Sequence, residues 1–315
     1  MLKVGVVGVG KISTVHINGW KEYEGAELVA LCDVRPELME AYPEQRHYTD
    51  FETMMDSEEL DVVDICLPTY LHAEYAKKAM ERGKHVLCEK PISLNKQDVT
   101  MLYETAKRNN VHFMTAQVVR FMPAYRLLIQ MCNDGRYGKL LSGTMTRRSG
   151  FPSGRWEEWM QDEKKSGHVP YDFHIHDLDF LVYAFGRPDS FECYRDHKPD
   201  QDCLNMIYHY GDVTINAQGA WYAGCYPFTA AYVFQFEDAV VANEGDKLTA
   251  YTRDGQVKNL NEERVDTGDM GLSSGPYAAE IRYFAECIRN NESTFGMVHP
   301  DSLITVQEIL EEITK

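Results

Sequence analysis

The chain has 315 residues, enough for two domains, because single domains usually run roughly 100–200 residues. Hydrophobic residues make up 44% and charged residues 26%, the balance of an ordinary globular protein, which argues against a disordered chain. The formal net charge of -17 repels phosphate backbones, so nucleic acid is not an expected partner. The same charge disfavours an anionic substrate and suits a neutral polyhydroxy compound.

Neither targeting segments nor disulfide bonds are expected. The first residues enter a strand-like run, Leu2 to Val7, with no basic region or cleavage site before it, so we expect no signal peptide. No stretch approaches the roughly 18 apolar residues of a membrane-spanning helix. The eight cysteines are scattered and form no Cys-x-x-Cys pair. This usage favours reduced thiols and predicts a cytoplasmic location.

Residues 1–120 alternate short apolar runs with amphipathic stretches. The expected strands are Lys3–Val7, Leu28–Cys32, Val62–Leu67, His85–Cys88 and Val111–Ala116. The expected helices are Ile12–Tyr23, Phe51–Asp56, Tyr70–Arg82 and Asn95–Asn109. Apolar strands separated by helices predict a parallel sheet that is covered on both faces. We therefore expect an α/β, doubly wound Rossmann domain over residues 1–120, which binds a dinucleotide.

Residues 121–315 have a different pattern. A helix over Pro123–Asn133 is followed by short strands that tight turns such as Asp254-Gly255 separate. The expected strands are Leu140–Arg148, Phe191–Arg195, Leu204–Tyr210, Val213–Tyr222, Thr229–Phe236, Ala239–Asn243, Leu248–Thr252 and Val257–Leu260. Two helices, Tyr277–Asn290 and Pro300–Ile313, close the chain. This pattern predicts an α+β domain for substrate binding and oligomerisation, with a large, mostly antiparallel open sheet.

A glycine pattern follows the first strand. Gly8 and Gly10 stand before Lys11, Ile12 and Ser13, where a strand ends and a helix opens. The dinucleotide fingerprint requires this context, in which Gly8 allows a tight turn and Gly10 lets amide groups approach a pyrophosphate. Glycines also serve ordinary turns, so this match alone is weak. We predict that Gly8, Gly10, Lys11 and Ile12 bind the cofactor.

A carboxylate and a guanidinium follow the second strand. Asp33 stands 23 residues after Gly10, where it would accept hydrogen bonds from the adenosine ribose. The alternative is a solvated aspartate at a strand end. Arg35 could lie over the adenine or pair with a 2′-phosphate. We predict that both residues contact the cofactor, and that NAD is preferred while NADP remains usable.

Two further segments carry a family resemblance. Residues 83–91, Gly-Lys-His-Val-Leu-Cys-Glu-Lys-Pro, and residues 67–72, Leu-Pro-Thr-Tyr-Leu-His, resemble motifs of the glucose–fructose oxidoreductase / inositol dehydrogenase / MocA family. The resemblance implies a Rossmann domain followed by an open-sheet domain that builds dimers or tetramers. It also implies that Lys90 reaches both the cofactor and a substrate oxygen. The other residues it places in the cofactor cleft are Glu89, Pro68, Thr69 and His72.

A stripe of polar residues marks the second domain. With a helix running from Pro170 to Phe185, Asp172, His176, Asp179 and Tyr183 would lie along one face. A carboxylate four residues before an imidazole can orient it for acid–base catalysis. The spacing of Asp172 and His176 also resembles the family's acid–base motif, although only Gly167 matches its upstream glycine run. The alternative is a polar helix face with a surface histidine.

The remaining candidates are weaker. His174 and His176 would suit a metal site on a strand, but two residues apart on a helix they point away from each other, so no metal is expected. Arg120 contacts the substrate or pairs with an acidic neighbour. Trp156, Trp159 and Tyr277 are candidates for stacking on a sugar ring, although aromatic residues lie more often in the core.

Together these residues predict an NAD(P)-dependent oxidoreductase that acts on a hydroxyl or carbonyl group of a sugar, cyclitol or related polyol. His176 would take the hydroxyl proton, Asp172 would orient His176, and Lys90 would stabilise the alkoxide-like oxygen. Two alternatives stay open. One is an NAD-dependent glycosidase that oxidises its sugar transiently, and the other is a non-catalytic nucleotide-sensing regulator.

Overall fold

The computed structural model describes residues 1–154, 156–263 and 275–315, but not the side chain of Trp156. The chain divides into two compact units. The first comprises Met1–Phe121 and the described part of Thr267–Gln307, and the second comprises the described part of Met122–Asp266 and Glu308–Lys315. Among the described helices, none is long and apolar enough to cross a membrane.

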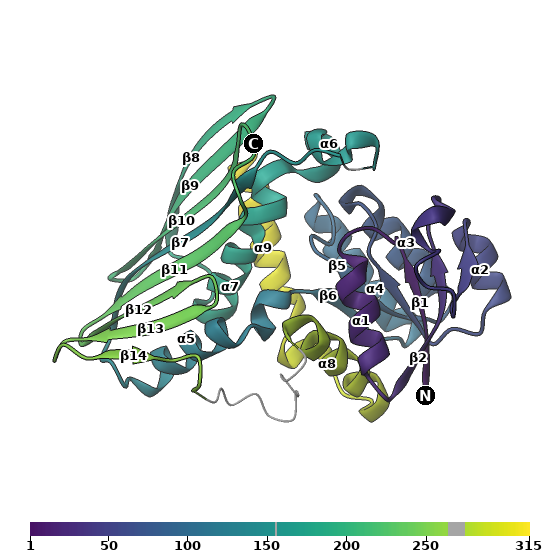
Figure 1. Cartoon of the computed structure of the whole chain (residues 1–315), viewed down its shortest axis with the longest axis horizontal. Coiled ribbons are helices and arrows are strands. Elements are labelled where there is room, and N and C mark those ends of the chain that lie inside the picture. Colours follow the sequence, from purple (N-terminus) through teal and green to yellow (C-terminus); the bar gives the residue numbers. More distant parts are fainter. Residues whose placement is uncertain (155, 264–274) are drawn as a thin grey trace. The chain divides into compact units, whose positions relative to one another are not determined.

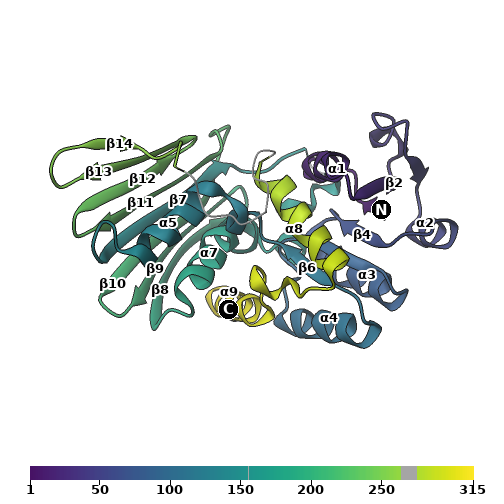
Figure 2. The same ribbon diagram turned by 90° about the horizontal axis from the view of Figure 1, so that it is seen from below.

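The first unit is built on a six-stranded sheet with the order β3-β2-β1-β4-β5-β6, in which every pairing is parallel. Its strands are β1 (Leu2–Val7), β2 (Ala26–Cys32), β3 (Arg46–Tyr48), β4 (Val62–Ile65), β5 (His85–Glu89) and β6 (Phe113–Ala116). Its helices are α1 (Ser13–Glu22), α2 (Phe51–Ser57), α3 (Thr69–Glu81), α4 (Lys96–Asn109) and α8 (Pro276–Asn290). Figure 2 shows α1 and α8 over one face of the sheet and α3 and α4 over the other. The predicted doubly wound fold is therefore confirmed.

The position of α8 differs from the expected division at residue 120. The sequence pattern assigned all later residues to the second domain, but α8 belongs to the compact unit of the Rossmann sheet. Close packing explains this: a Cβ at Gly19 of α1 would stand 2.6 Å from Cδ1 of Ile281 in α8. Tyr23 adds a hydrogen bond of 2.6 Å to Glu286. A domain boundary placed from composition cannot detect a later helix that packs in the unit of the first sheet.

The second unit contains an eight-stranded sheet with the order β14-β13-β12-β11-β7-β10-β9-β8 (Figure 1). Its strands are β7 (Leu140–Gly150), β8 (Ser190–Lys198), β9 (Gln201–Tyr210), β10 (Val213–Tyr222), β11 (Thr229–Phe236), β12 (Ala239–Glu244), β13 (Lys247–Thr252) and β14 (Val257–Asn259). Only the pairing of β7 with β10 is parallel among the described strand pairs of this sheet. The expected large, mostly antiparallel sheet is confirmed.

Helices cover one face of this sheet. They are α5 (Pro123–Asp134) and α7 (Ile175–Phe185), which both views show against the strands. A cavity between these helices and β9 and β10 is lined by apolar side chains such as Ile129 and Ile215. The short helix α6 (Glu163–Ser166) precedes α7, and α9 (Pro300–Ile313) ends the chain. Helix α7, which carries His176, therefore packs against this face of the sheet.

Candidate active site

The glycine loop between β1 and α1 has the shape that a pyrophosphate requires. Gly8 has φ +90°, and a Cβ there would stand 2.6 Å from the carbonyl oxygen of Cys66, so only glycine fits. A Cβ at Gly10 would meet no described atom within 4 Å. Helix α1 begins at Ser13, and Ile12 before it provides no side-chain cap. Its first amide groups can therefore donate to an anion.

Asp33 lies just after β2 and is tied to this loop. One carboxylate oxygen accepts a hydrogen bond of 2.8 Å from the Val9 amide. Arg35 donates to the same carboxylate through its own amide at 2.9 Å and its guanidinium at 3.1 and 3.2 Å. The side chain of Asp33 is only 5% exposed and that of Arg35 is 31% exposed. Asp33 therefore organises the glycine loop.

The segment around Lys90 is held by buried partners. Glu89 ends β5, and its Oε2 accepts the Lys90 amide hydrogen at 3.0 Å. The ring nitrogens of His72, in α3, lie 2.7 Å from the carbonyl oxygens of Pro91 and Leu67. Glu89 and His72 are both buried. These contacts hold the main chain on both sides of Lys90, and the cofactor contacts predicted for Glu89 and His72 stay predictions.

The first unit thus gathers the predicted nucleotide-binding residues at one edge of its sheet. Gly8 follows β1, Asp33 follows β2, Pro68 and Thr69 follow β4, and Lys90 follows β5. These strands are parallel neighbours, so their carboxyl ends meet at the same edge. Ligands of doubly wound sheets bind at this edge. Lys11, next to Gly10, is exposed there.

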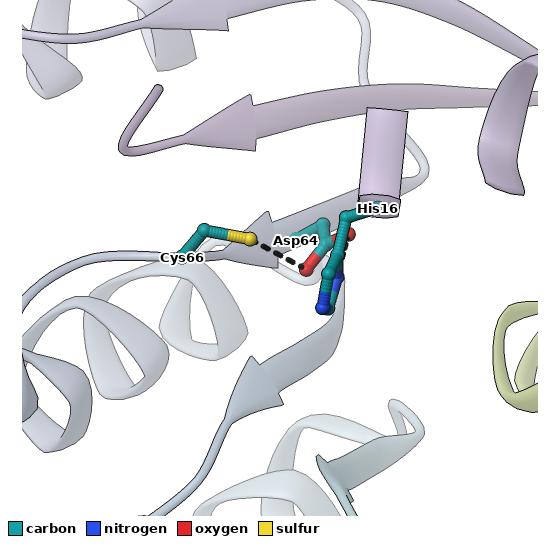
Figure 3. Close-up of side chains that lie close together, drawn as sticks. All are labelled: His16, Asp64 and Cys66. Atoms are coloured by element: carbon teal, nitrogen blue, oxygen red, sulfur yellow. Dashed lines mark hydrogen bonds and ion pairs between the residues drawn. The ribbon is translucent and has the colours of Figure 1, made fainter. Parts of the chain in front are cut away.

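A buried polar cluster lies behind this edge, and Figure 3 shows part of it. His16 of α1 is completely buried, with Nδ1 2.9 Å from Asp64 Oδ2 and Nε2 2.9 Å from Glu89 Oε1. Asp64 also accepts hydrogen bonds from Trp20 at 2.7 Å and from the Cys66 thiol at 3.7 Å. His16, Asp64 and Cys66 have the residue types of a metal site. The contacts of His16 and Trp20 with Asp64 have hydrogen-bond lengths, so the group is a satisfied hydrogen-bond network.

A third carboxyl group, Glu280 of α8, belongs to the same cluster. It is completely buried, and among the described residues no side chain forms a hydrogen bond with its oxygens, while the main chain of Gln117 acts to lower its pKa. Burial and the neighbouring charge of Glu89 raise the pKa of Glu280 well above its usual value, and His16 offsets only part of this rise. Burial and the neighbouring charge therefore favour the protonated form of Glu280 over its carboxylate.

In the second unit the predicted acid–base stripe has a different backbone. Pro170–His174 form a π-helical turn, and α7 begins only at Ile175. A π turn adds a residue to the turn and changes the register. Asp172 and His176 are therefore not two positions of one continuous α-helix as predicted. Both are partly exposed, whereas Asp179 is completely buried.

His174 and Asp177 point into the protein interior. His174 Nε2 lies 2.5 Å from the Tyr208 hydroxyl, and burial lowers the pKa of His174 to about 3, so its ring is neutral. Asp177 pairs with Arg147 at 2.8 Å, and both are buried. His174 and His176 therefore have different surroundings, and neither belongs to a cluster of metal-ligating groups among the described residues.

Another cluster in this unit contains Glu163, His168 and His197. His168 Nδ1 lies 2.9 Å from His197 Nε2, which is a hydrogen-bond distance. Glu163 already pairs with the guanidinium of Arg195 at 2.9 Å. The positive charge of Arg195 disfavours a cation at this place.

The predicted substrate contacts have different outcomes. Arg120 is 1% exposed, and its guanidinium donates to the Met297 carbonyl at 2.7 Å and to the Ser302 hydroxyl at 3.0 Å. These contacts hold Arg120 in the first unit, and the substrate contact considered for it stays a prediction. Tyr277 opens α8, with its ring centroid 6.1 Å from that of His16. Trp156 was a third candidate, but its side chain lies outside the described part of the structure.

Sequence reasoning missed His16, Asp64 and Glu280. One signal was present: Asp64 stands in the strand sequence Val-Val-Asp-Ile, where a buried carboxylate needs a partner. His16 lies near the start of α1, just after the glycine loop. Its partners, Asp64 and Glu89, are 48 and 73 residues away in sequence. No local pattern connects residues so far apart.

The fold and the glycine loop define a dinucleotide-binding α/β protein. Residues 2–117 match the oxidoreductase family model with the NAD-binding Rossmann fold, and residues 125–241 match the GFO/IDH/MocA C-terminal domain. The chain belongs to this GFO/IDH/MocA oxidoreductase family. The predicted cofactor, NAD, is the one that the family description names.

Matches to individual relatives cover only part of this chain. The chain is 34% identical to a 2,7-anhydro-N-acetylneuraminate hydratase from Mediterraneibacter gnavus, over 58% of this chain and 48% of that protein. It is 31% identical to a myo-inositol 2-dehydrogenase from Thermotoga maritima, over 59% of this chain and 55% of that protein. The chain spans about half the length of the curated relatives it matches. A levoglucosan dehydrogenase structure with NADH and levoglucosan shares the fold, with a TM-score of 0.83 and 18% identity over 99% of this chain and 97% of that one.

Proposed function

We propose that this protein is an NAD-dependent oxidoreductase that acts on a CH–OH group of a sugar, cyclitol or related polyol. The observation that carries the proposal is the sheet edge of the first unit, where the open glycine loop, Asp33 and Lys90 follow neighbouring parallel strands. Membership of an NAD-binding oxidoreductase family supports the reaction type. Relatives named myo-inositol and D-apiose dehydrogenases support the substrate class.

The residues of the first unit fit this cofactor. The uncapped amides of α1 and the space at Gly10 suit a pyrophosphate, and Asp33 can accept hydrogen bonds from ribose hydroxyls. Lys11 and Ile12 belong to the same loop, and Pro68 and Thr69 to the next strand end. NAD supplies a hydride acceptor when bound.

We assign the chemistry on the substrate to three side chains. Lys90 stabilises negative charge on the reacting oxygen, because its ammonium follows a buried strand at the ligand-binding edge. His176 takes the hydroxyl proton and Asp172 orients the imidazole, in accord with the partial exposure of both. In the opposite direction the same groups return the proton to a carbonyl oxygen.

We further propose a cytoplasmic protein that works on a small molecule as a homodimer or homotetramer through the sheet of the second unit. All eight cysteines are free thiols, which supports a reducing compartment. Val233 and Tyr251 are 40% and 50% exposed on that sheet, which supports a subunit contact.

A substrate screen tests the main proposal. Purified protein is incubated with NAD and a panel of cyclitols, aldoses and glycosides, and both NADH absorbance and sugar products are measured. The proposed function requires one NADH for each substrate molecule oxidised. Product without net NADH would instead support transient oxidation of the sugar. The relative named a hydratase is a reason to measure this outcome. Binding of NAD with no product from any compound would favour a sensor.

A further inference from the structure

A buried imidazole connects the helix that follows the glycine loop to the segment that carries Lys90. His16 bonds to Glu89 through Nε2 at 2.9 Å, and the other oxygen of Glu89 accepts the Lys90 amide hydrogen at 3.0 Å. On its other side His16 bonds to Asp64, which Trp20 of the same helix also contacts. The path from α1 to Lys90 therefore consists of two short hydrogen bonds through one side chain.

The link is charged. Both ring nitrogens of His16 face carboxylate oxygens, which only accept hydrogen bonds, so both nitrogens must carry a hydrogen. Burial is the largest single influence and opposes the charge, but the charges and hydrogen bonds of Asp64 and Cys66 together outweigh it, so the pKa of His16 is raised well above its usual value. Hydrogen bonding to His16 lowers the pKa of Glu89 in spite of burial. The groups that face His16 are thus the carboxyl groups of Asp64 and Glu89, with Glu280 nearby, whose pKa burial raises.

We propose that His16 and Glu89 are a positioning pair that fixes the main chain at Lys90. The Glu89 side chain has several rotamers. The hydrogen bond to His16 selects the rotamer in which Oε2 accepts the Lys90 amide hydrogen. His72 holds the Pro91 carbonyl just beyond, so Lys90 stands between two fixed points. The role of Lys90 in hydride transfer rests on the proposed function, whereas the link itself does not.

Trp20 provides a matched control on the same helix. It is completely buried and bonds to Asp64, as His16 does, but no described hydrogen bond joins it to Glu89. Trp20→Phe removes a buried hydrogen bond of α1 without touching the link to Lys90. His16→Gln removes the bridge, because one amide group cannot donate to Asp64 and Glu89 from opposite sides. Glu89→Gln tests the same link from its other end and is available if His16→Gln does not fold.

Amide hydrogen exchange and histidine NMR test the link without any enzyme assay. In the parent, both ring nitrogens of His16 should show imidazolium ¹⁵N shifts at pH 8. The Lys90 amide should exchange at least ~10-fold faster in His16→Gln than in the parent, and within about twofold of the parent in Trp20→Phe. Neutral imidazole shifts, or equal acceleration of the Lys90 amide in both variants, would overturn the proposal.

Kinetics then connect the link to the reaction. With a substrate from the screen, His16→Gln should lower kcat by roughly 10-fold or more, with KM for NAD within about threefold, because misplacement of a reacting group by 1 Å can lower rates ~10²-fold. Trp20→Phe should keep kcat near that of the parent. A kcat that is unchanged in His16→Gln would overturn the positioning role. Absence of hydride transfer in the parent, together with the predicted exchange pattern, would reject the proposed function and leave the link standing.

Discussion

Arg35 folds back on Asp33 and donates to it through the main chain and the guanidinium, at distances of 2.9 to 3.2 Å. The sequence suggested two side chains that compete for the adenosine end of the cofactor. In the structure they are partners, because the carboxylate that would repel a 2′-phosphate also holds the guanidinium that would attract it. Cofactor choice therefore depends on the pair rather than on either residue alone.

The pair predicts a moderate preference for NAD, of roughly 10–100-fold in kcat/KM, because hydrogen bonds to a charged group contribute ~1.5–3 kcal/mol. Asp33→Ser should narrow or invert this preference, since it removes the repulsive charge and releases Arg35. Arg35→Ala is the matched control: it keeps the carboxylate and should widen the preference. Steady-state kinetics with both cofactors measure these ratios. A parent that favours NADP, or an unchanged ratio in Asp33→Ser, would show that this pair does not discriminate.

Lys90→Ala and His176→Ala should each lower turnover by ~10²-fold or more, because general acid–base groups contribute ~10²–10⁴-fold. The dissociation constant for NAD, measured by fluorescence titration, should stay within about threefold, since neither side chain is assigned to the adenosine half. His209→Ala, in strand β9, is a control histidine for which we expect parental turnover. Either variant retaining more than about a tenth of the parental turnover would exclude the role assigned to that residue.

The sequence predicted the regular elements well where turn residues mark their ends. Strands β10 and β11 have the expected bounds, Val213–Tyr222 and Thr229–Phe236, because Gly211-Asp212 and Glu237-Asp238 interrupt the alternation of buried and exposed residues. Strand β3 was missed, since its three residues, Arg46–Tyr48, lack a buried side chain. The π turn at Pro170–His174 was missed too, because one extra residue in a turn leaves the apolar periodicity of a short helix almost unchanged.

The site was predictable only in part, for a similar reason. The residues of the glycine loop and the segment after β5 are contiguous and have a fixed order along the chain. The pairing of His16 with Glu89 depends instead on the positions of α1 and β5 across the sheet, and Glu280 reaches the same cluster from α8, near the end of the chain. Such contacts follow from the packing of the first unit, which no local spacing encodes.

The outward face of the eight-stranded sheet predicts an oligomer. Register places Val233 opposite Thr144, on the face that does not carry the core residue Phe234. We expect the parent to have the mass of two or four chains by light scattering at micromolar concentration. Val233→Arg should shift the mass toward one chain, because it places a charge in an apolar contact, whereas Val34→Arg in the first unit should not. A parent with the mass of one chain would contradict the prediction.

Glu280 should make the first unit less stable as the pH rises. Its pKa is raised in the folded protein above its ordinary value of 4.5, mainly by burial. Between 4.5 and the raised folded pKa, the folded chain holds a proton that the unfolded chain has released. The free energy of unfolding therefore falls with increasing pH in this window, by at most ~1.4 kcal/mol per pH unit. The favourable contribution of the neutral acid is fully present below pH 4.5.

Glu280→Gln removes this titration and keeps the shape of the side chain. The variant should therefore gain thermal stability relative to the parent as the pH rises from 5 to 8, with the difference in Tm growing by at least ~2–4 °C, the shift expected for about 1 kcal/mol in a unit of this size. Glu292→Gln, an exposed position just after the same helix, should show no such trend. Asp64, Glu89 and His16 face Glu280 in all of these proteins, so taking the difference between variant and parent cancels most of their own titration. A Tm difference that is constant between pH 5 and pH 8 would mean that Glu280 is ionised in the folded protein, with its charge balanced by the His16 imidazolium.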